Sequence, residues 1–194
     1  MKLELPAKPV LLPSPVLVIG TYGSDGKANI MTAAWGGIAS SNPPCVSVSI
    51  REARLTHQNI MQNGAFTVNI PSEKHMKEAD FAGIVSGKKH DKFIEARLTP
   101  EKSKRINAPI VKEFPYALEC KLIKQIELGV HTMFIGEIVG IVAESEVLDS
   151  SHLPDIEKVR PMLFSTSNSA YYSIGDKVGT AYSAGKELKQ EEKK

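Results

Sequence analysis

Short segments in which apolar and polar residues alternate are the feature that most limits how this chain can fold. Residues 45–51 read Cys-Val-Ser-Val-Ser-Ile-Arg, so a strand there would have one apolar and one polar face. Residues 65–71 alternate in the same way. Longer alternating or apolar runs occupy residues 116–126 and 131–143, with Gly129 between them as a turn. These runs predict a chain built mainly from β-strands.

Two further strands fit the same class of fold. They are predicted at residues 15–21 and 28–34, because the Asp-Gly pair at residues 25–26 is a strong hairpin signal. Residues 36–44 are predicted to form a loop, since the two prolines at its end oppose both a helix and strand pairing. Many strands divided by turns indicate an antiparallel barrel or sandwich.

Helices contribute little to the predicted fold. One short helix is predicted to begin with Thr56 as its N-cap and to end at Gly64, and a second begins with Ser72. No internal repeat or interdomain linker is visible, so residues 1–194 are predicted to form one domain. The charged run at residues 186–194 is predicted to be a disordered tail.

Composition and charge argue against several classes of protein. A formal net charge of +2 is close to neutral, whereas a nucleic-acid-binding face needs clustered lysine and arginine. The first residues lack the apolar core of a signal peptide, and no apolar run approaches the roughly 18 residues of a membrane span. We therefore expect a cytoplasmic protein without a nucleic-acid or membrane partner.

The cysteines and histidines show no spacing typical of a metal site or a redox motif. Cys45 and Cys120 are predicted to be buried reduced thiols on strands, with a disulfide or a redox pair as the alternative. The five histidines are scattered, and the chain lacks the motifs of Rossmann folds, P-loops, zinc proteases and serine hydrolases. No metal ligand and no catalytic acid, base or nucleophile is assigned.

A candidate anion site lies where one strand ends and the first helix begins. Ser49 and Arg51 end the strand and Thr56 opens the helix, which brings together hydroxyls, a fixed cation and free backbone N–H groups. Trp35 follows an apolar strand and precedes two glycines that would let backbone approach a ligand closely. Each residue has a structural alternative: a helix cap, a surface charge and a core aromatic. An apolar wall beside an anion corner suits a flat, phosphorylated cofactor such as a flavin nucleotide.

Three other groups carry two interpretations each. Lys88, Lys89 and Lys92 form a basic segment that is either a solvated face or a contact to a phosphate or an anionic flavin. His131 is either a strand-edge residue or a polar contact to a cofactor or a nicotinamide. The tyrosine pair at residues 171–172 is interpreted as packing or interface.

The order and spacing of several motifs resemble a known family. From about residue 15 to residue 185, the chain is similar to the flavin reductase-like, FMN-binding split-barrel proteins, and most closely to their flavoredoxin branch. The motifs that carry the resemblance are Gly20-Thr21, Asp25-Gly-Lys-Ala-Asn29, Thr32-Ala-Ala-Trp35, Ser40-Ser-Asn-Pro-Pro44, Ser47-Val-Ser-Ile-Arg51, Thr56-His-Gln-Asn-Ile60, Phe66-Thr-Val-Asn-Ile-Pro71, Ser86-Gly-Lys-Lys-His-Asp-Lys-Phe93 and His131-Thr-Met-Phe-Ile-Gly-Glu137.

The resemblance implies a mainly β fold, a six-stranded antiparallel Greek-key split barrel with a few short peripheral helices. It also implies a homodimer with FMN near the interface. The residues implied to line the flavin ring are Asn29, Met31, Thr32, Ala33, Ala34 and Trp35. Those implied to hold the ribityl phosphate are Ser49, Ile50, Arg51, Thr56 and His57. The segment implied to close over the flavin contributes Ser86, Gly87, Lys88 and Lys92, and His131 would lie on the nicotinamide side.

One departure from the family pattern bears on the electron donor. Reductases of two-component monooxygenases in this family carry Gly-Asp-His where residues 129–131 read Gly-Val-His, which favours the flavoredoxin type. Two functions remain open: an FMN-dependent oxidoreductase that takes electrons from NADH or NADPH, and an electron carrier whose FMN is reduced by a redox protein. A small-molecule-binding protein with a degenerate site is a third.

Overall fold

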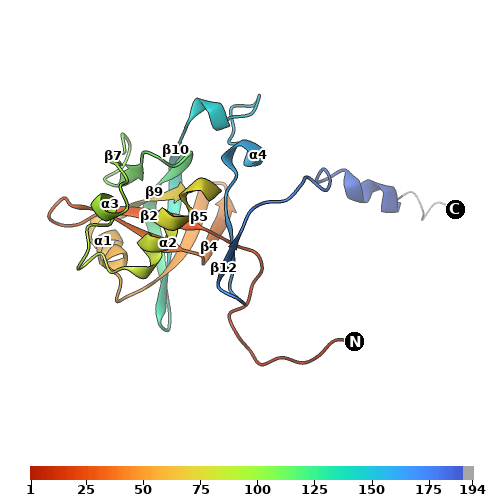
Figure 1. The fold of residues 1–194 in the computed structure, drawn as a ribbon, viewed down its shortest axis with the longest axis horizontal. Coiled ribbons are helices and arrows are strands. Elements are labelled where there is room, and N and C mark those ends of the chain that lie inside the picture. Colours follow the sequence, from red (N-terminus) through yellow and green to blue (C-terminus); the bar gives the residue numbers. More distant parts are fainter. Residues whose placement is uncertain (190–194) are drawn as a thin grey trace.

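A computed structural model describes residues 1–189, which form a body of strands and short helices with two extended ends. Figure 1 shows the red N-terminal segment and the blue segment after β12 (Ala170–Tyr172) running away from that body. Within the predicted disordered tail, residues 186–189 belong to a 3-10 helix, η3 (Ala184–Lys189), and residues 190–194 lie outside the described residues.

Seven strands form the main sheet, paired antiparallel in the order β3-β2-β6-β9-β10-β5-β4. The strands β3 and β4 stand at the two ends of this order, so the barrel is split between them. The prediction of a mainly β, antiparallel split barrel is confirmed, with one strand more than the six expected. The bounds are β2 Leu17–Tyr22, β3 Ala28–Ala33, β4 Gly36–Ser41, β5 Pro44–Arg51, β6 Ala65–Ile70, β9 Tyr116–Leu128 and β10 His131–Ala143.

The additional strand is β4, and the loop predicted at residues 36–44 was therefore wrong. β4 pairs antiparallel with β5 along most of its length. Pro43 lies in the turn between the two strands and Pro44 is the first residue of β5. A proline at the first position of a strand, or outside it, removes little from the ladder of hydrogen bonds. The proline pair therefore bounds the strand pair instead of preventing it.

Short helices lie around the barrel, as predicted. Gly64 ends α1 in the left-handed conformation, with φ +62°. Thr56 was predicted as the N-cap of this helix, but it is the second helical residue, because its hydroxyl is engaged with Asn29 inside the protein. Arg54 occupies the cap position and makes no side-chain cap. The helices are α1 Leu55–Asn63, α2 Met76–Ile84, α3 Lys92–Glu95 and α4 Ile156–Val159, with 3-10 turns η1 Glu73–His75 and η2 Ser145–Val147.

Side chains fill the interior of the barrel. Ile19, Phe66 and Phe134 are fully buried in one cluster contributed by β2, β6 and β10. A Cβ at Gly136 would lie 2.6 Å from Cζ of Phe66, so the ring requires the space that a glycine leaves there. Gly136 also coincides with a shift in the register between β9 and β10. The interior is thus a packed core.

A second buried cluster attaches α2 to the sheet. Val18 and Ile30, from β2 and β3, pack in this cluster with Ala79 and Ala82 of α2. A small three-stranded sheet and a two-stranded sheet complete the body. Their bounds are β1 Ser14–Pro15, β11 Leu163–Ser165, β12, β7 Pro100–Lys102 and β8 Pro109–Val111. The buried cluster of Val18, Ile30, Ala79 and Ala82 therefore fixes α2 against β3. The candidate site lies at the end of β3.

Two smaller predictions can also be compared with the structure. Cys45 and Cys120 are both free and buried, as the preferred interpretation stated. Among residues 1–189, no helix combines the length and the apolar character needed to cross a membrane.

Candidate functional site

Most of the residues predicted to bind a cofactor line one pocket of about 210 Å³, which we call the arginine pocket. It lies where the end of β3, the end of β5 and the start of β10 meet. Arg54, which follows β5, was not predicted to be a site residue. A basic residue directly before a helix N-terminus could have indicated an anion site. The lining residues are Met31, Thr32, Ala33, Ala34, Trp35, Ser49, Ile50, Arg51, Arg54 and His131.

Strand pairing brings these residues together. In the antiparallel ladder of β5 and β10, His131 is the register partner of Arg51. The backbone N–H of Ser49 donates a hydrogen bond to the carbonyl oxygen of Trp35 at 2.8 Å, which holds the chain after β3 against β5. The Trp35 ring then lies beside the His131 ring, with centroids 4.6 Å apart. Segments distant in the sequence therefore form one wall.

The arginine pocket is electrically positive. Arg51 and Arg54 line it, and no carboxylate is among its lining residues. Burial, and then the neighbouring Arg51, lower the pKa of His131, so its imidazole is neutral at pH 7. The first turn of α1 begins directly after Arg54 and has no side-chain cap, which leaves N–H groups available to an anion. The pocket is thus suited to a phosphate or another anion.

An adjoining pocket extends the available space beyond the arginine pocket. It has a volume of about 560 Å³ and shares Ala34, Trp35 and Ser49 with the arginine pocket. Lys8 to Leu11 of the N-terminal segment form part of its wall. Ligand pockets of small molecules usually span about 300–1,000 Å³. The two pockets together therefore offer room for a flat cofactor across Trp35.

Asn29 and Thr56 lie below the surface. The amide of Asn29 donates to the hydroxyl of Thr56 at 2.9 Å, and Asn59 donates to Thr21 at 3.0 Å close by. Asn29 and Thr56 are both buried, and neither lines the arginine pocket. This buried polar network connects β2 and β3 to α1 and fixes where the first turn of α1 points.

His57 is also placed behind the pocket wall. Its Nε2 lies 2.9 Å from the hydroxyl of Thr132, and its ring meets Phe134 edge-on at 5.0 Å between centroids. Burial lowers the pKa of His57, with nearby Glu52 opposing that shift. His57 therefore supports the junction of α1 and β10 and does not line the arginine pocket.

The segment predicted to close over the cofactor has residues in two places: Gly87 and Lys88 line a surface pocket, and Lys92 is buried. Gly87 and Lys88 line a separate pocket of about 450 Å³, together with Asn29 and the hairpin between β2 and β3. A Cβ at Gly87 would lie 2.2 Å from Oδ1 of Asn29, so only glycine fits this contact. The hydroxyl of Ser86 accepts a hydrogen bond from the N–H of Lys88 at 3.4 Å. Gly87 and Lys88 therefore line this separate pocket, and none of Ser86, Gly87 and Lys88 lines the arginine pocket.

Lys92 is a buried cation. Its ammonium donates to the carbonyl oxygen of Ala82 at 2.6 Å, and the side chain has no ion-pair partner among residues 1–189. Burial, and then the nearby charge of Arg54, lower the pKa of Lys92 to about 8. Lys92 does not line the arginine pocket, but its field adds to that of Arg54.

No group of histidine, cysteine or acidic side chains within the described residues could hold a metal ion.

Comparison with known proteins identifies a common family. Residues 10–173 match the family described as "Flavin reductase like domain". The flavoredoxin of Desulfovibrio vulgaris (Miyazaki F) is 45% identical with a TM-score of 0.91, over 95% of this chain and 100% of that chain. Flavoredoxin from Methanosarcina acetivorans is 32% identical with a TM-score of 0.90, over 97% and 99% of the two chains. An uncharacterized protein of Archaeoglobus fulgidus is 37% identical over 130 residues, 67% of this chain and 72% of that protein.

Proposed function

Because this chain belongs to the flavin reductase-like family, we propose that it is an oxidoreductase that binds FMN in the arginine pocket and passes electrons through it. One observation carries the proposal. The arginine pocket joins a wall formed by the end of β3 and Trp35 to two arginines at the uncapped start of α1. A flat ring attached to a phosphate needs both parts in this arrangement.

The phosphate would be held by charge and by backbone. Arg51 and Arg54 present guanidinium groups, which form strong charge-assisted hydrogen bonds to phosphate oxygens. The first turn of α1 begins directly after Arg54 without a side-chain cap, and a nine-residue helix supplies a dipole of the required sign. Lys92 lies behind them and adds positive potential.

The ring would lie against the end of β3. Ala33 and Ala34 are small there, so backbone N–H and C=O groups can reach the edge of a ring. Trp35, 40% exposed, and His131 form a joint aromatic surface beside that wall. When bound, FMN supplies the acceptance and release of a hydride or of single electrons. The residues of this chain orient the ring, exclude water from one side and set the local charge.

The electron donor divides the proposal into two cases. In the first, NADH or NADPH reduces the flavin, and the neutral imidazole of His131 contacts the nicotinamide side. In the second, the protein is an electron carrier that a redox protein reduces. Val130, which replaces the aspartate of the Gly-Asp-His pattern, is 70% exposed and apolar. This exposed apolar side chain favours the second case, because it offers contact surface and no charge to a nucleotide.

Two further expectations remain proposals. We propose a homodimer, because Leu11 and Ile38 are 75% and 71% exposed beside Trp35, and a second copy of the chain would cover them. The cytoplasmic location stays a prediction from the sequence.

The decisive experiment is an absorption spectrum of the purified protein, followed by anaerobic titration with NADH and NADPH. A flavin spectrum that bleaches with either nucleotide supports the oxidoreductase case. A flavin spectrum that bleaches only with a reduced redox protein such as ferredoxin supports the carrier case. A colourless protein that fails to bind added FMN in fluorescence titration contradicts the proposal as a whole.

Arg51→Ala tests where the phosphate lies. We expect FMN affinity to fall more than tenfold, because a charge-assisted hydrogen bond contributes about 1.5–3 kcal/mol. Lys121→Ala, which removes an equal charge from an exposed position on β9, is the matched control and should bind as the wild type does. Equal affinity of the wild type and Arg51→Ala would remove Arg51 from the phosphate site.

A further inference from the structure

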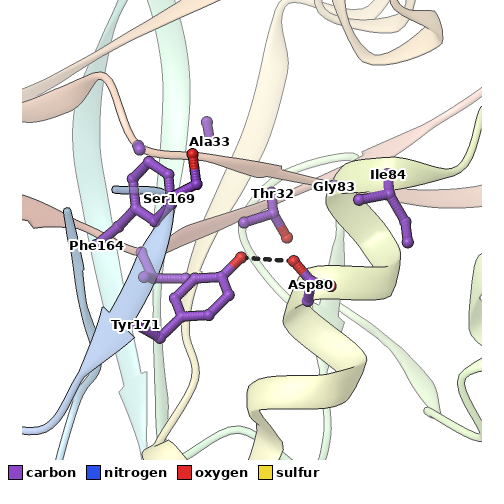
Figure 2. A pocket seen from close by; sticks show the side chains of 10 residues that line it. Thr32, Ala33, Asp80, Gly83, Ile84, Phe164, Ser169 and Tyr171 are labelled. Atoms are coloured by element: carbon purple, nitrogen blue, oxygen red, sulfur yellow. Dashed lines mark hydrogen bonds between the residues drawn. The ribbon is translucent and has the colours of Figure 1, made fainter. Parts of the chain in front are cut away.

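Another cavity, of about 300 Å³, adjoins the arginine pocket and is not used by the proposed FMN site. The two share Thr32, Ala33 and Ala34, so the end of β3 separates them. Figure 2 shows this cavity between β3, α2 and the β11–β12 pair, and we call it the Asp80 cavity. Its lining residues are Val16, Thr32, Ala33, Ala34, Asp80, Gly83, Ile84, Phe164, Ser169 and Tyr171.

The walls of the Asp80 cavity are mostly apolar and partly aromatic. Val16 and Ala33 are buried on one side, and Ile84 stands at the mouth with 71% of its surface exposed. The rings of Phe164 and Tyr171 lie 5.5 Å apart between centroids, tilted by 48°. Such a space suits a flat or compact apolar body, and aromatic faces attract a cation within about 6 Å.

Asp80 is the single charged residue among the ten that line the cavity. The Tyr171 hydroxyl donates to its Oδ1 at 2.9 Å, and the dashed line in Figure 2 marks this bond. Burial, and then Asp80 itself, raise the pKa of Tyr171 to about 12, so the phenol keeps its proton and continues to donate at neutral pH. Within residues 1–189, the second carboxylate oxygen has neither a hydrogen bond nor an ion pair.

Within the described residues, the hydroxyls of Thr32 and Ser169 make no hydrogen bond with Asp80. Thr32 donates its proton to the carbonyl oxygen of Ala79 and is therefore already engaged. Ser169 is exposed at the rim. Asp80 is half-buried, and none of the residues that line the cavity carries a positive charge.

We propose that the Asp80 cavity is a binding subsite for a small organic cation, an ammonium or amidinium group carried on a flat apolar body. The free oxygen of Asp80 accepts from the cationic nitrogen, while Phe164 and Tyr171 cover the body. Tyr171 orients the carboxylate by holding its other oxygen. The shared residues Thr32 to Ala34 would place this ligand next to the flavin, a placement that rests on the proposed function.

Calorimetric titration with three isosteric probes tests the subsite. Benzylammonium carries the cation, benzyl alcohol replaces it with a neutral hydroxyl, and benzoate reverses its sign. We expect benzylammonium to bind at least tenfold more tightly than benzyl alcohol, and benzoate not to bind. Equal binding of all three probes, or binding of none, would overturn the proposal.

Two variants locate the effect at Asp80. Asp80→Asn keeps the shape and a hydrogen-bond acceptor but removes the charge, and should abolish the tenfold preference for benzylammonium while leaving benzyl alcohol unchanged. Ile84→Lys is a second variant at an exposed position, so folding is not at risk. Its ammonium at the mouth should weaken benzylammonium binding at least threefold. A preference retained in both variants would refute the assignment to Asp80.

Ile94→Lys is the matched control for the second variant, because Ile94 is 74% exposed and does not line the cavity. It should bind benzylammonium as the wild type does. The titration requires no flavin, so it separates this proposal from the previous one. A protein that binds no FMN but keeps the probe preference contradicts only the proposed function. A flavoprotein without the preference contradicts only the subsite.

Discussion

Replacing the buried lysine of α3 should stabilise the protein and weaken its binding of a phosphate. Lys92 is 4% exposed, and its pKa falls from 10.5 to about 8. At about 1.4 kcal/mol per pH unit, that fall corresponds to roughly 3 kcal/mol of unfavourable burial of the charged form. Lys92→Met removes this penalty and loses one hydrogen bond to Ala82, which is worth about 1–1.5 kcal/mol. The net expectation at pH 7 is a stabilisation of about 2 kcal/mol.

The pH dependence of this gain has a defined sign. Below pH 8, Lys92 is charged in both the folded and the unfolded chain, so the full penalty applies. Between pH 8 and 10.5 the folded state loses the proton while the unfolded state keeps it, and the stability of the wild type rises relative to the variant. The advantage of Lys92→Met should therefore be largest near pH 7 and should shrink toward pH 10.

Urea unfolding of the flavin-free protein measures this difference directly. The unfolding free energies of the wild type and of Lys92→Met are compared at pH 7 and near pH 10, so that contributions of other titrating groups cancel. Lys89→Met, at an exposed position of the preceding turn, is the control and should change stability little. A variant less stable than the wild type at pH 7, or a difference that does not vary with pH, would refute the reasoning.

The same variant links stability to binding. A bound phosphate would compensate the charges of Arg54 and Lys92, so we expect FMN affinity to fall in Lys92→Met, by less than in Arg51→Ala because Lys92 does not line the arginine pocket. A residue that destabilises the free protein and serves its ligand is the usual form of a trade-off between stability and function.

Three further predictions concern the barrel itself. Asn29→Ala should destabilise the protein by about 1–3 kcal/mol in urea unfolding, because it leaves the buried hydroxyl of Thr56 without its donor; an unchanged midpoint would contradict this role. Arg105→Ala should lower the free energy of unfolding by about 2 kcal/mol at neutral pH, because Glu119 is fully buried and its Oε2 lies 2.7 Å from the guanidinium. Half of Arg105 is exposed, which limits the loss. Lys104→Ala is the neighbouring control. Burial raises the pKa of the Cys120 thiol to about 12, so iodoacetamide should not label it in the folded protein, and rapid labelling at pH 8 would be incompatible with this core position.

The sequence predicted the strands well because their pattern has a local cause. The segment with Val46, Val48 and Ile50 alternates because one face of β5 is buried and the other is not, and the structure shows this burial. Gly64 was identified as a helix end because a left-handed residue is needed there and glycine adopts it readily. These two predictions, each of which depends on a single segment, were confirmed.

Predictions that depend on partners distant in the sequence were less complete. Thr56 has the side chain of an N-cap, but a hydrogen bond from Asn29 draws it into the interior. The strand β4 has little apolar alternation, and only its pairing with β5 reveals it as a strand. The Asp80 cavity lies between α2 and the strands β11 and β12, which are more than eighty residues apart in the sequence. No sequence motif predicts that these elements meet.

The family resemblance named the candidate site residues, and the structure shows which of them line the same pocket. Trp35, Arg51 and His131 line one pocket. Arg54 joins them without having been predicted, and Lys92 lies behind them as a buried cation. Spacing along the chain could not separate lining residues from supporting ones, because burial decides that difference.

The contact between Gly136 and Phe66 has a consequence for how the protein can be loaded with its ligands. Because aromatic side chains fill the interior of the barrel, that interior leaves no space for a ligand. Both pockets at the end of β3 lie outside that core, so a cofactor can enter or leave without any strand separating from its neighbour. The FMN of the proposed function would therefore enter and leave while the strands of the barrel stay paired.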